Sequence, residues 1–170
     1  MFCRFFFNDT ATTEIYTLSL HDALPISGGK YLHMPAGGSL LPANHDTIDK
    51  KMHYLKQEGK TVYKYAVKKM ADVCLKILER NGLSGKDIKL FIPHQANKRI
   101  IDAAAQRCGF TENQVLININ KYGNTTAGTI PIGLDEAVED GIIQNGDLIL
   151  LSAFGAGFSW GSMLLRWGVN

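Results

Sequence analysis

The sequence of 170 residues contains few cysteines, and their spacing fits neither a metal site nor a disulfide framework. Cys3, Cys74 and Cys108 lie far apart, and an odd number argues against a secreted disulfide scaffold. No apolar run approaches the roughly 18 residues that cross a bilayer, and Asn8-Asp9 interrupts the apolar start too early for a signal peptide. These absences predict a protein of a reducing compartment, the cytoplasm, without a metal site or a membrane span.

Acidic residues are scarce in one part of the chain. The whole sequence has a net charge of +2, but residues 47–99 contain thirteen lysines or arginines and only five acids, a local charge of +8. Such a basic stretch indicates an anionic partner. Apolar residues make up 45% of the sequence and charged residues 20%, which are globular proportions that exclude wholesale disorder. The length predicts one domain, or one half of a larger fold.

Residues 1–27 differ in composition from the lysine-rich, glycine-punctuated chain that follows. They show neither sustained alternation nor a helical stripe. The stretch FFFNDTATTEIYTLSLHDALPIS resembles translated sequencing-adapter read-through, which implies that the natural gene begins further upstream; an ordinary variable N-terminal segment is the alternative. We therefore expect residues 1–27 to be a non-native or disordered segment, and residues 28–170 to form the domain.

After residue 28, strand and helix patterns alternate. Helical spacing is clearest over residues 61–80 and recurs over 95–107 and from about Pro131 to Gly141. A long polar loop precedes the first helix, and strands are predicted at 30–34, 88–92, 115–119, 147–153 and 162–167. The order β-α-β-α-β-α-β-β predicts an α/β fold with a mainly parallel five-stranded sheet, crossover helices and an antiparallel final strand pair.

Two glycine motifs near the C-terminus favour a structural explanation. Gly155-Ala-Gly-Phe-Ser-Trp-Gly161 is similar to a phosphate-binding loop, but a strand pattern follows it and its third glycine comes one residue too late. Gly157-Phe-Ser-Trp-Gly161 matches the nucleophile elbow of serine hydrolases, yet neither an acidic residue nor a histidine follows it. We expect these glycines to permit a tight turn and close backbone approach.

Two polar side chains follow predicted strands, at the sheet edge where open α/β folds bind ligands. His94 stands where strand 88–92 ends and a helix begins, and Asn124 takes the corresponding place one unit later. A helix N-terminus disfavours imidazolium, so a neutral His94 can donate one N–H, and the Asn124 amide is a second donor. Two converging donors suit an enolate or thioester oxygen. The alternatives are a histidine that caps its own helix and an asparagine in a left-handed turn.

Three motifs occur in a characteristic order and spacing. They are Pro93-His-Gln-Ala-Asn97, Tyr122-Gly-Asn-Thr-Thr126 with Ile130-Pro131, and Phe154-Gly-Ala-Gly-Phe-Ser-Trp-Gly161. Together they resemble the C-terminal half of β-ketoacyl-acyl carrier protein synthase III, and residues 59–67 are similar to the helix that precedes these motifs in that family. The resemblance implies a thiolase-like half and an acyltransferase. The reaction it implies starts fatty acid synthesis by decarboxylative condensation of an acyl-CoA primer with malonyl-acyl carrier protein.

The resemblance also implies roles for individual residues. In the family's Cys-His-Asn triad, His94 and Asn124 match the catalytic pair, and the nucleophilic cysteine belongs to a missing N-terminal half. Cys74 and Cys108 lie on apolar helix faces, where we expect core positions. The backbone N–H of Ala156 matches an oxyanion donor. The pantetheine-channel positions match Gly59, Tyr63, Ala66 and Asn97, and the carrier-protein docking positions match Lys64, Lys98 and Arg99.

The implied ligands are substrates and not bound cofactors: a coenzyme A thioester and the phosphopantetheine arm of the acyl carrier protein. The implied partners are acyl carrier protein, acyl-CoA, the missing N-terminal half and a second subunit in a homodimer, with no nucleic acid. We expect the fragment alone to be inactive. Two alternatives remain: a non-catalytic module that binds carrier protein or coenzyme A, and a related thiolase-fold synthase of the polyketide, quinolone or long-chain ketone type.

Overall fold

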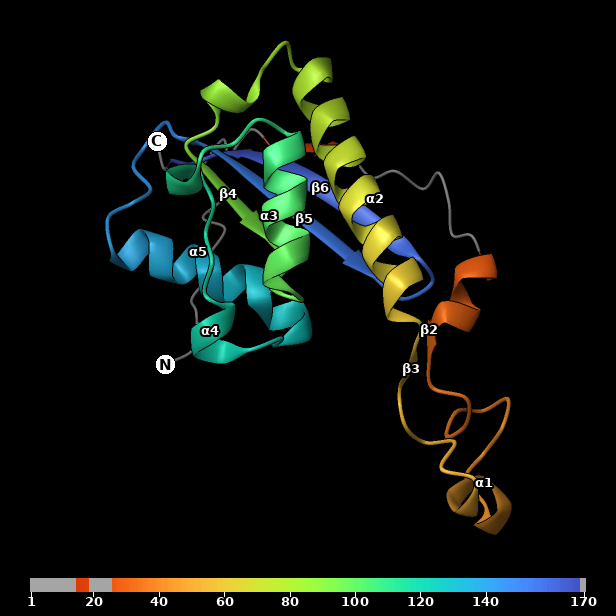
Figure 1. Ribbon diagram of the computed structural model, residues 1–170. Coiled ribbons are helices and arrows are strands. Elements are labelled where there is room, and N and C mark those ends of the chain that lie inside the picture. Colours follow the sequence, from red (N-terminus) through yellow and green to blue (C-terminus); the bar gives the residue numbers. More distant parts are fainter. Residues whose placement is uncertain (1–14, 19–25, 169–170) are drawn as a thin grey trace.

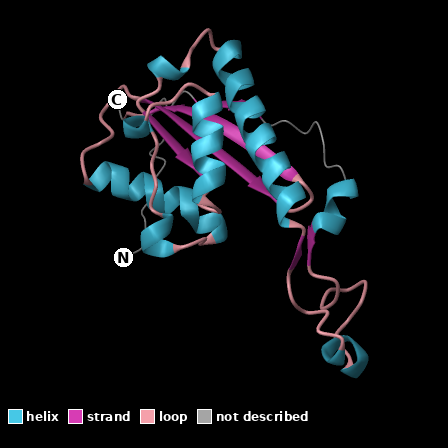
Figure 2. Cartoon of the chain, viewed as in Figure 1, coloured by secondary structure: helices cyan, strands magenta, loops and turns pink. Residues whose placement is uncertain are grey.

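A four-stranded sheet forms the centre of the computed structural model, which describes residues 15–18 and 26–168. The strands lie in the order β1-β6-β5-β4, with bounds β1 (Ile15–Leu18), β4 (Leu90–Pro93), β5 (Leu148–Gly155) and β6 (Ser159–Arg166). Helices α2 (Gly59–Arg80) and α3 (Lys98–Arg107) cover one face, and α5 (Thr129–Glu139) covers the other (Figures 1 and 2). The result is a three-layer α/β arrangement.

Alternation along the strands supplies both faces of the sheet with apolar side chains. In β4, Phe91 packs with residues of α2, while its neighbour Ile92 packs with residues of α5. The next strand repeats the pattern, because Leu150 lies on the α2 side and Ile149 on the α5 side. Successive side chains of a strand point to opposite faces, so a strand covered on both sides is apolar throughout.

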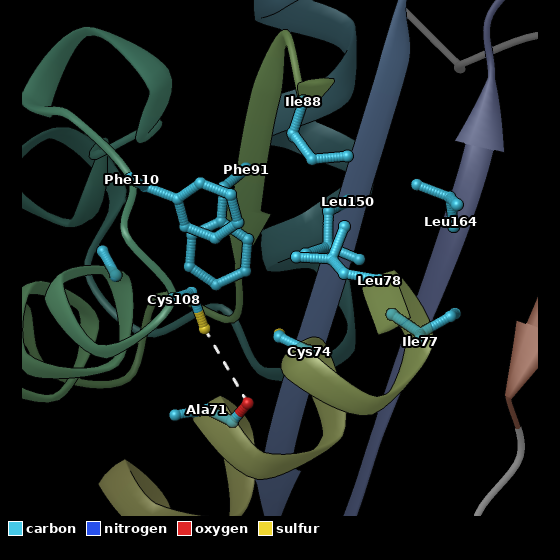
Figure 3. Packing of buried hydrophobic residues seen from close by; sticks show 11 residues of the cluster. Ala71, Cys74, Ile77, Leu78, Ile88, Phe91, Cys108, Phe110, Leu150 and Leu164 are labelled. Atoms are coloured by element: carbon cyan, nitrogen blue, oxygen red, sulfur yellow. Dashed lines mark hydrogen bonds between the residues drawn. The ribbon is translucent and has the colours of Figure 1, made fainter. Parts of the chain in front are cut away.

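Helix α2 follows the predicted helix closely and ends at Arg80, with Asn81 as its C-cap, as the Asn-Gly sequence indicates. Its buried side chains face the sheet and α3, and they include both Met70 and Ile77. Figure 3 shows one part of this core, where the rings of Phe91 and Phe110 stack with centroids 4.9 Å apart. Helix α3 begins three residues later than predicted, at Lys98, because Asn97 caps it.

The sequence predicts a mainly parallel sheet of five strands, but in the described part the sheet has four strands and one parallel pair. The pair β4–β5 is parallel, whereas β5–β6 and β1–β6 are antiparallel, and the antiparallel final pair was predicted. Residues 30–34 do not join this sheet: η1 (Ile26–Tyr31) runs into a two-residue strand, β2 (Leu32–His33), which pairs with β3 (Lys56–Gln57). Strand β1 falls within residues 1–27, whose expected non-native character stays a prediction; residues 1–14 and 19–25 lie outside the described part.

The predicted strand 115–119 is wrong, and a buried side chain explains why. Residues 112–122 form η3 (Glu112–Gln114), a single parallel bridge from Val115 to Phe91, and α4 (Ile119–Tyr122). Gln95 donates from Nε2 to the carbonyl of Leu116, and its Oε1 accepts from the N–H groups of Asn118 and Ile119. These backbone groups would pair with a neighbouring strand, but a side chain satisfies them instead.

Residues 32–57 form an arm that projects away from the sheet in Figure 1. The arm contains α1 (His45–Asp49), which the sequence analysis left within a loop, and its base is the β2–β3 pair. Local bonds shape it: Asn44 caps α1 by accepting from the N–H of Thr47, and the Thr47 hydroxyl contacts Nε2 of His53 at 2.9 Å. The arm carries exposed apolar side chains, namely Met34, Leu40, Ile48, Tyr54 and Leu55.

Candidate active site

A pocket of about 550 Å³ lies where β4 ends and the β5–β6 hairpin turns. Three segments line it: the residue after β4, the loop after α4, and the hairpin. The lining residues are His94, Asn124, Thr126, Ala153, Phe154, Gly155, Ser159, Trp160 and Gly161. The two predicted catalytic side chains, which are 30 positions apart in the sequence, therefore face the same space.

His94 follows β4 directly, and its N–H donates to the carbonyl of Ser152 on β5 at 2.8 Å. Its half-buried ring places Nδ1 2.7 Å from the hydroxyl of Thr129, the first residue of α5. Burial lowers the pKa of His94, so the imidazole is neutral at physiological pH. The neutral form was expected from the N-terminus of the following helix, but that helix begins at Lys98. Asn97 is its cap, so His94 does not cap its own helix.

Asn124 is exposed and lies between α4 and η4 (Thr126–Gly128). Its Oδ1 accepts from the backbone N–H of Thr126 at 3.0 Å. The amide nitrogen Nδ2 is therefore the end of the side chain that remains for a ligand, and it is a donor. The left-handed positions of this loop are Gly123 and Thr126, with φ of 68° and 53°, so Asn124 itself does not occupy the left-handed turn considered above.

Thr126 connects the two candidate residues through its backbone. Its N–H holds the Asn124 side chain, and its carbonyl accepts at 3.1 Å from the Thr129 hydroxyl that contacts His94. A non-glycine residue at positive φ costs about 1–3 kcal/mol and persists where its surroundings fix it. Here the hydrogen bonds of its own N–H and its own carbonyl hold Thr126 in this strained conformation. The orientations of both candidate side chains therefore depend on the same turn.

Gln95 belongs to the first of the three sequence motifs, which alone assigns it no role. Its side chain is fully buried and makes four hydrogen bonds: Nε2 donates to the carbonyls of Pro93 and Leu116, and Oε1 accepts from two N–H groups beyond Leu116. It thus ties the end of β4 to the segment that leads into α4 and Asn124. A glutamine two residues after the end of a fully apolar strand is the signal that points to such a buried link.

Glu136 of α5 braces α4, which precedes Asn124. Its carboxylate accepts from Nδ2 of Asn118 at 2.7 Å, Nζ of Lys121 at 2.9 Å and the hydroxyl of Tyr122 at 2.8 Å. Partial burial raises the pKa of Glu136, but the hydrogen bonds from these three donors outweigh burial and hold the pKa below its ordinary value. Sequence patterns do not point to Glu136, because its hydrogen-bond partners are 14 to 18 positions away.

The other predicted site residues are spread around the pocket. Ala156 is exposed at the hairpin tip and lies next to the lining residue Gly155, and its carbonyl accepts from the Ser159 hydroxyl. The β5–β6 hairpin confirms the expected tight turn at Gly155 and Gly157, whereas Gly161 lies within β6 and pairs with Ala153. Gly59 is the exposed first residue of α2. Ala66 is 2% exposed and packs in the core beneath the pocket, so its contribution in this structure is packing.

A predicted channel residue, Tyr63, and a predicted docking residue, Arg99, contact each other. The Arg99 guanidinium lies over the Tyr63 ring, 5.4 Å from its centroid, and joins the first turns of α2 and α3. Lys98 forms an exposed ion pair with Asp102, and Lys64 is exposed on α2. Asn97 uses Oδ1 to accept from the Arg99 N–H, so its side chain caps α3. These residues lie around the N-terminal ends of the two helices.

The cysteines of the described part lie in the core, and neither lines the pocket. Cys74 and Cys108 are buried between α2 and α3, as expected, and the Cys108 thiol contacts the carbonyl of Ala71 at 3.8 Å (Figure 3). A hydrogen bond with Cys108 and burial raise the pKa of the Cys74 thiol, which keeps it protonated. Among the described residues, no cluster of histidine, cysteine and acidic side chains is arranged for a metal ion. Likewise, none of the described helices has the length and hydrophobicity that a bilayer crossing requires.

Comparison with known proteins places the chain in a family. The family profile described as 3-Oxoacyl-[acyl-carrier-protein (ACP)] synthase III C terminal matches residues 78–167, which is more than half of the sequence. The chain belongs to this family. The matched stretch contains His94, Asn124 and the β5–β6 hairpin, so it covers the whole pocket described above.

Relatives of the synthase III family extend the match beyond that stretch. The β-ketoacyl-[acyl-carrier-protein] synthase III of Koribacter versatilis is 57% identical over 140 residues, 82% of this chain and 42% of the relative. The crystal structure of the Thermus thermophilus synthase III superposes with a TM-score of 0.75 at 35% identity, covering 96% of this chain and 48% of that one. The priming β-ketosynthase of the R1128 polyketide pathway superposes with a TM-score of 0.74 at 28% identity, over 94% and 46% of the two chains.

These likenesses confirm the predicted thiolase-like half, with the strand count and directions corrected above. The chain spans less than half the length of the relatives it matches.

Proposed function

We propose that this chain is the C-terminal half of an acyltransferase that starts fatty acid synthesis by joining an acyl primer from coenzyme A to malonyl-acyl carrier protein. The observation that carries the proposal is the shared pocket, into which His94 and Asn124 present one polar end each. Membership of the synthase III family supports the same reaction. The thioester substrates need no bound cofactor, and the expected compartment is the cytoplasm.

In the proposed reaction, a cysteine of the upstream half carries the acyl primer as a thioester. The bond between the malonyl carboxylate and its methylene carbon breaks, carbon dioxide leaves, and the electron pair becomes an enolate. The enolate carbon then attacks the acyl thioester, and the cysteine thiolate leaves. His94 and Asn124 stabilise the enolate oxygen, and the Ala156 N–H holds the oxygen of the acyl thioester.

The positions on α2 and α3 suit the carrier side of the reaction. Gly59, Tyr63 and Asn97 are proposed to line the pantetheine channel, with Ala66 packed in the core behind them, and Lys64, Lys98 and Arg99 are proposed to receive the acidic carrier protein. The +8 charge of residues 47–99 supports this docking surface independently of the family match. A homodimer of complete subunits is part of the proposal. The likeness to a priming polyketide synthase favours a second candidate, a condensing enzyme that supplies a polyketide starter.

The test separates two half-reactions in a full-length protein, made by joining residues 28–170 to the upstream half of the Koribacter versatilis relative. Acyl-enzyme formation and carbon dioxide release are measured for the parent chimera and for His94→Ala and Asn124→Ala. We expect decarboxylation to fall by about 10²–10³ while acyl transfer changes less.

Equal loss of both steps, or unchanged carbon dioxide release, would contradict the proposed roles of His94 and Asn124. The acyl chain that the parent chimera accepts would separate the fatty acid from the polyketide candidate. Binding of carrier protein without any condensation by the parent would favour the non-catalytic module.

A further inference from the structure

The hydroxyl of Thr129 has two hydrogen-bond contacts but only one proton. It lies 2.7 Å from Nδ1 of His94 and 3.1 Å from the carbonyl of Thr126. A carbonyl only accepts, so the hydroxyl proton satisfies Thr126 and the hydroxyl oxygen is left to accept from His94. Thr129 is 2% exposed, and a buried polar group normally satisfies its contacts within the protein. Both contacts are made at once only if Nδ1 carries the imidazole proton.

We infer that Thr129 is a positioning residue that holds His94 in the Nδ1–H tautomer, with the Nε2 lone pair directed to the ligand. The inference rests on the proposed function only for its consequence and not for its geometry. A neutral His94 in this form cannot donate from Nε2. It first accepts a proton there, and only the resulting imidazolium donates to an oxygen. This changes the expectation from the sequence, in which a neutral His94 was itself a donor.

The turn around Thr126 determines which of the two site side chains donates a hydrogen bond to the ligand and which accepts one. Thr126 is held at positive φ by its N–H bond to Asn124, and its carbonyl is thereby presented to the Thr129 hydroxyl. The same turn thus makes Asn124 a donor and His94 an acceptor. The proton taken up at Nε2 comes from solvent, and the positive charge of the imidazolium balances the negative charge of the malonyl carboxylate and then of the enolate.

The test is direct and needs no activity. Histidine ring nitrogens that carry a proton and those that do not give well-separated ¹⁵N signals, so NMR of the ¹⁵N-histidine-labelled chain assigns the tautomer. We expect His94 in the parent chain to carry its proton on Nδ1. In Thr129→Val, which keeps the shape and removes the hydroxyl, we expect the Nε2–H tautomer to become the major form. Thr129→Ser should restore the parent tautomer.

Thr125→Val is the matched control, because the Thr125 hydroxyl is buried in the same loop and has no hydrogen-bond partner among the described residues. We expect it to leave the His94 tautomer unchanged. An Nε2–H tautomer in the parent chain would overturn the inference, whether or not any variant folds. An unchanged tautomer in folded Thr129→Val would overturn it as well.

An activity measurement keeps this inference distinct from the proposed function. In the full-length chimera, Thr129→Val should lower the decarboxylation rate by about 10- to 100-fold, as the loss of the outer hydrogen-bond partner does for metal-ligating histidines. Thr129→Ser should recover most of the loss. If His94→Ala retained activity, the proposed function would fail while the tautomer assignment stood. If His94→Ala lost activity but the parent tautomer were Nε2–H, only the role of Thr129 would fail.

Discussion

The end of β4 and the arm of residues 32–57 are both irregular backbone, yet they are held in opposite ways. At the end of β4, one fully buried side chain, Gln95, makes four hydrogen bonds and satisfies groups that a strand would otherwise pair. In the arm, short-range bonds among Asn44, Thr47 and His53 shape the backbone, while Leu40 is 98% exposed.

This difference shows which region of the chain can hold functional side chains in a precise geometry. Side chains that must converge within hydrogen-bond distance need a backbone fixed from several directions, and the end of β4 has that support. The pocket with His94 and Asn124 lies in this supported region. The arm is ordered locally, so changes within it should affect its own shape before they affect the sheet.

The largest expected loss of stability follows from a change in β4, the strand that directly precedes His94. Phe91 is fully buried and its ring stacks on Phe110, so Phe91→Ala removes a core ring and leaves a cavity. We expect the free energy of unfolding to fall by about 3–5 kcal/mol. Urea unfolding followed by circular dichroism measures it. Leu75→Ala, at a half-exposed site on α2, is the comparison and should cost much less. Equal losses of unfolding free energy in Phe91→Ala and Leu75→Ala would show that packing stabilises β4 no more than it stabilises the surface of α2.

The second effect concerns Gln95, the residue that links the two loops of the site. Gln95→Leu keeps a similar volume but leaves two carbonyls and two N–H groups without this partner. We expect a loss of about 3 kcal/mol in unfolding free energy, since unsatisfied buried groups cost about 1–3 kcal/mol each before relaxation. Gln106→Leu, at an exposed glutamine of α3, should be nearly neutral. A loss below about 1 kcal/mol in Gln95→Leu would contradict the link.

A smaller effect should appear as a pH dependence at Glu136. The pKa of Glu136 is below its ordinary value in the folded chain, so the unfolded chain binds more protons as the pH falls. Its contribution is present above the unfolded glutamate pKa of about 4.3 and is lost as the pH drops through the folded pKa. Glu136→Gln should therefore flatten the decline in stability in acid, measured by urea unfolding between pH 3 and 6 as a rough window. Asn118→Ala, which removes one of the donors to Glu136, should flatten the decline partly. Identical curves for the parent and both variants would contradict the stabilising role of these hydrogen bonds.

The same contrast explains which parts of the fold and the site can be predicted from the sequence alone. Apolar periodicity predicted α2 and the strands β4, β5 and β6, because these elements bury side chains against one another and the pattern records that burial. The motifs also predicted that His94 and Asn124 share one sheet edge. Residues 115–119 were predicted as a strand because their pattern is apolar, but the Gln95 side chain hydrogen-bonds to their backbone. Periodicity contains no information about a side chain 21 to 24 positions away.

The roles of Thr129 and Glu136 were also beyond the sequence. A threonine at the start of a helix and a glutamate within it are common features with ordinary explanations. Their functional meaning depends on distances of 2.7 Å to His94 and to Asn118, which arise only after α5 packs across the sheet. The two-residue strands of the arm were missed for a simpler reason: segments so short carry no period.

A local effect is expected at the cap of α1 in the arm. Asn44→Ala removes the side-chain oxygen that accepts from the Thr47 N–H. We expect a local loss of about 1 kcal/mol, as for other N-caps, seen as faster hydrogen exchange at the amides of residues 47–50. Global unfolding should change little, because α1 packs at the far end of the arm. Cooperative loss of the whole fold in this variant would show that the arm and the sheet unfold as one unit.

The smallest effect is expected at Leu40, whose side chain is 98% exposed. Replacing an exposed leucine by serine removes no contact that the folded chain makes, so Leu40→Ser should change the free energy of unfolding by no more than about 0.5 kcal/mol. The same urea measurement as for Phe91→Ala decides it, and the two variants bracket the comparison between the arm and the strand. A loss above about 1 kcal/mol would mean that Leu40 is covered in solution. In that case the arm would be held by more than its local hydrogen bonds, and its contrast with the end of β4 would disappear.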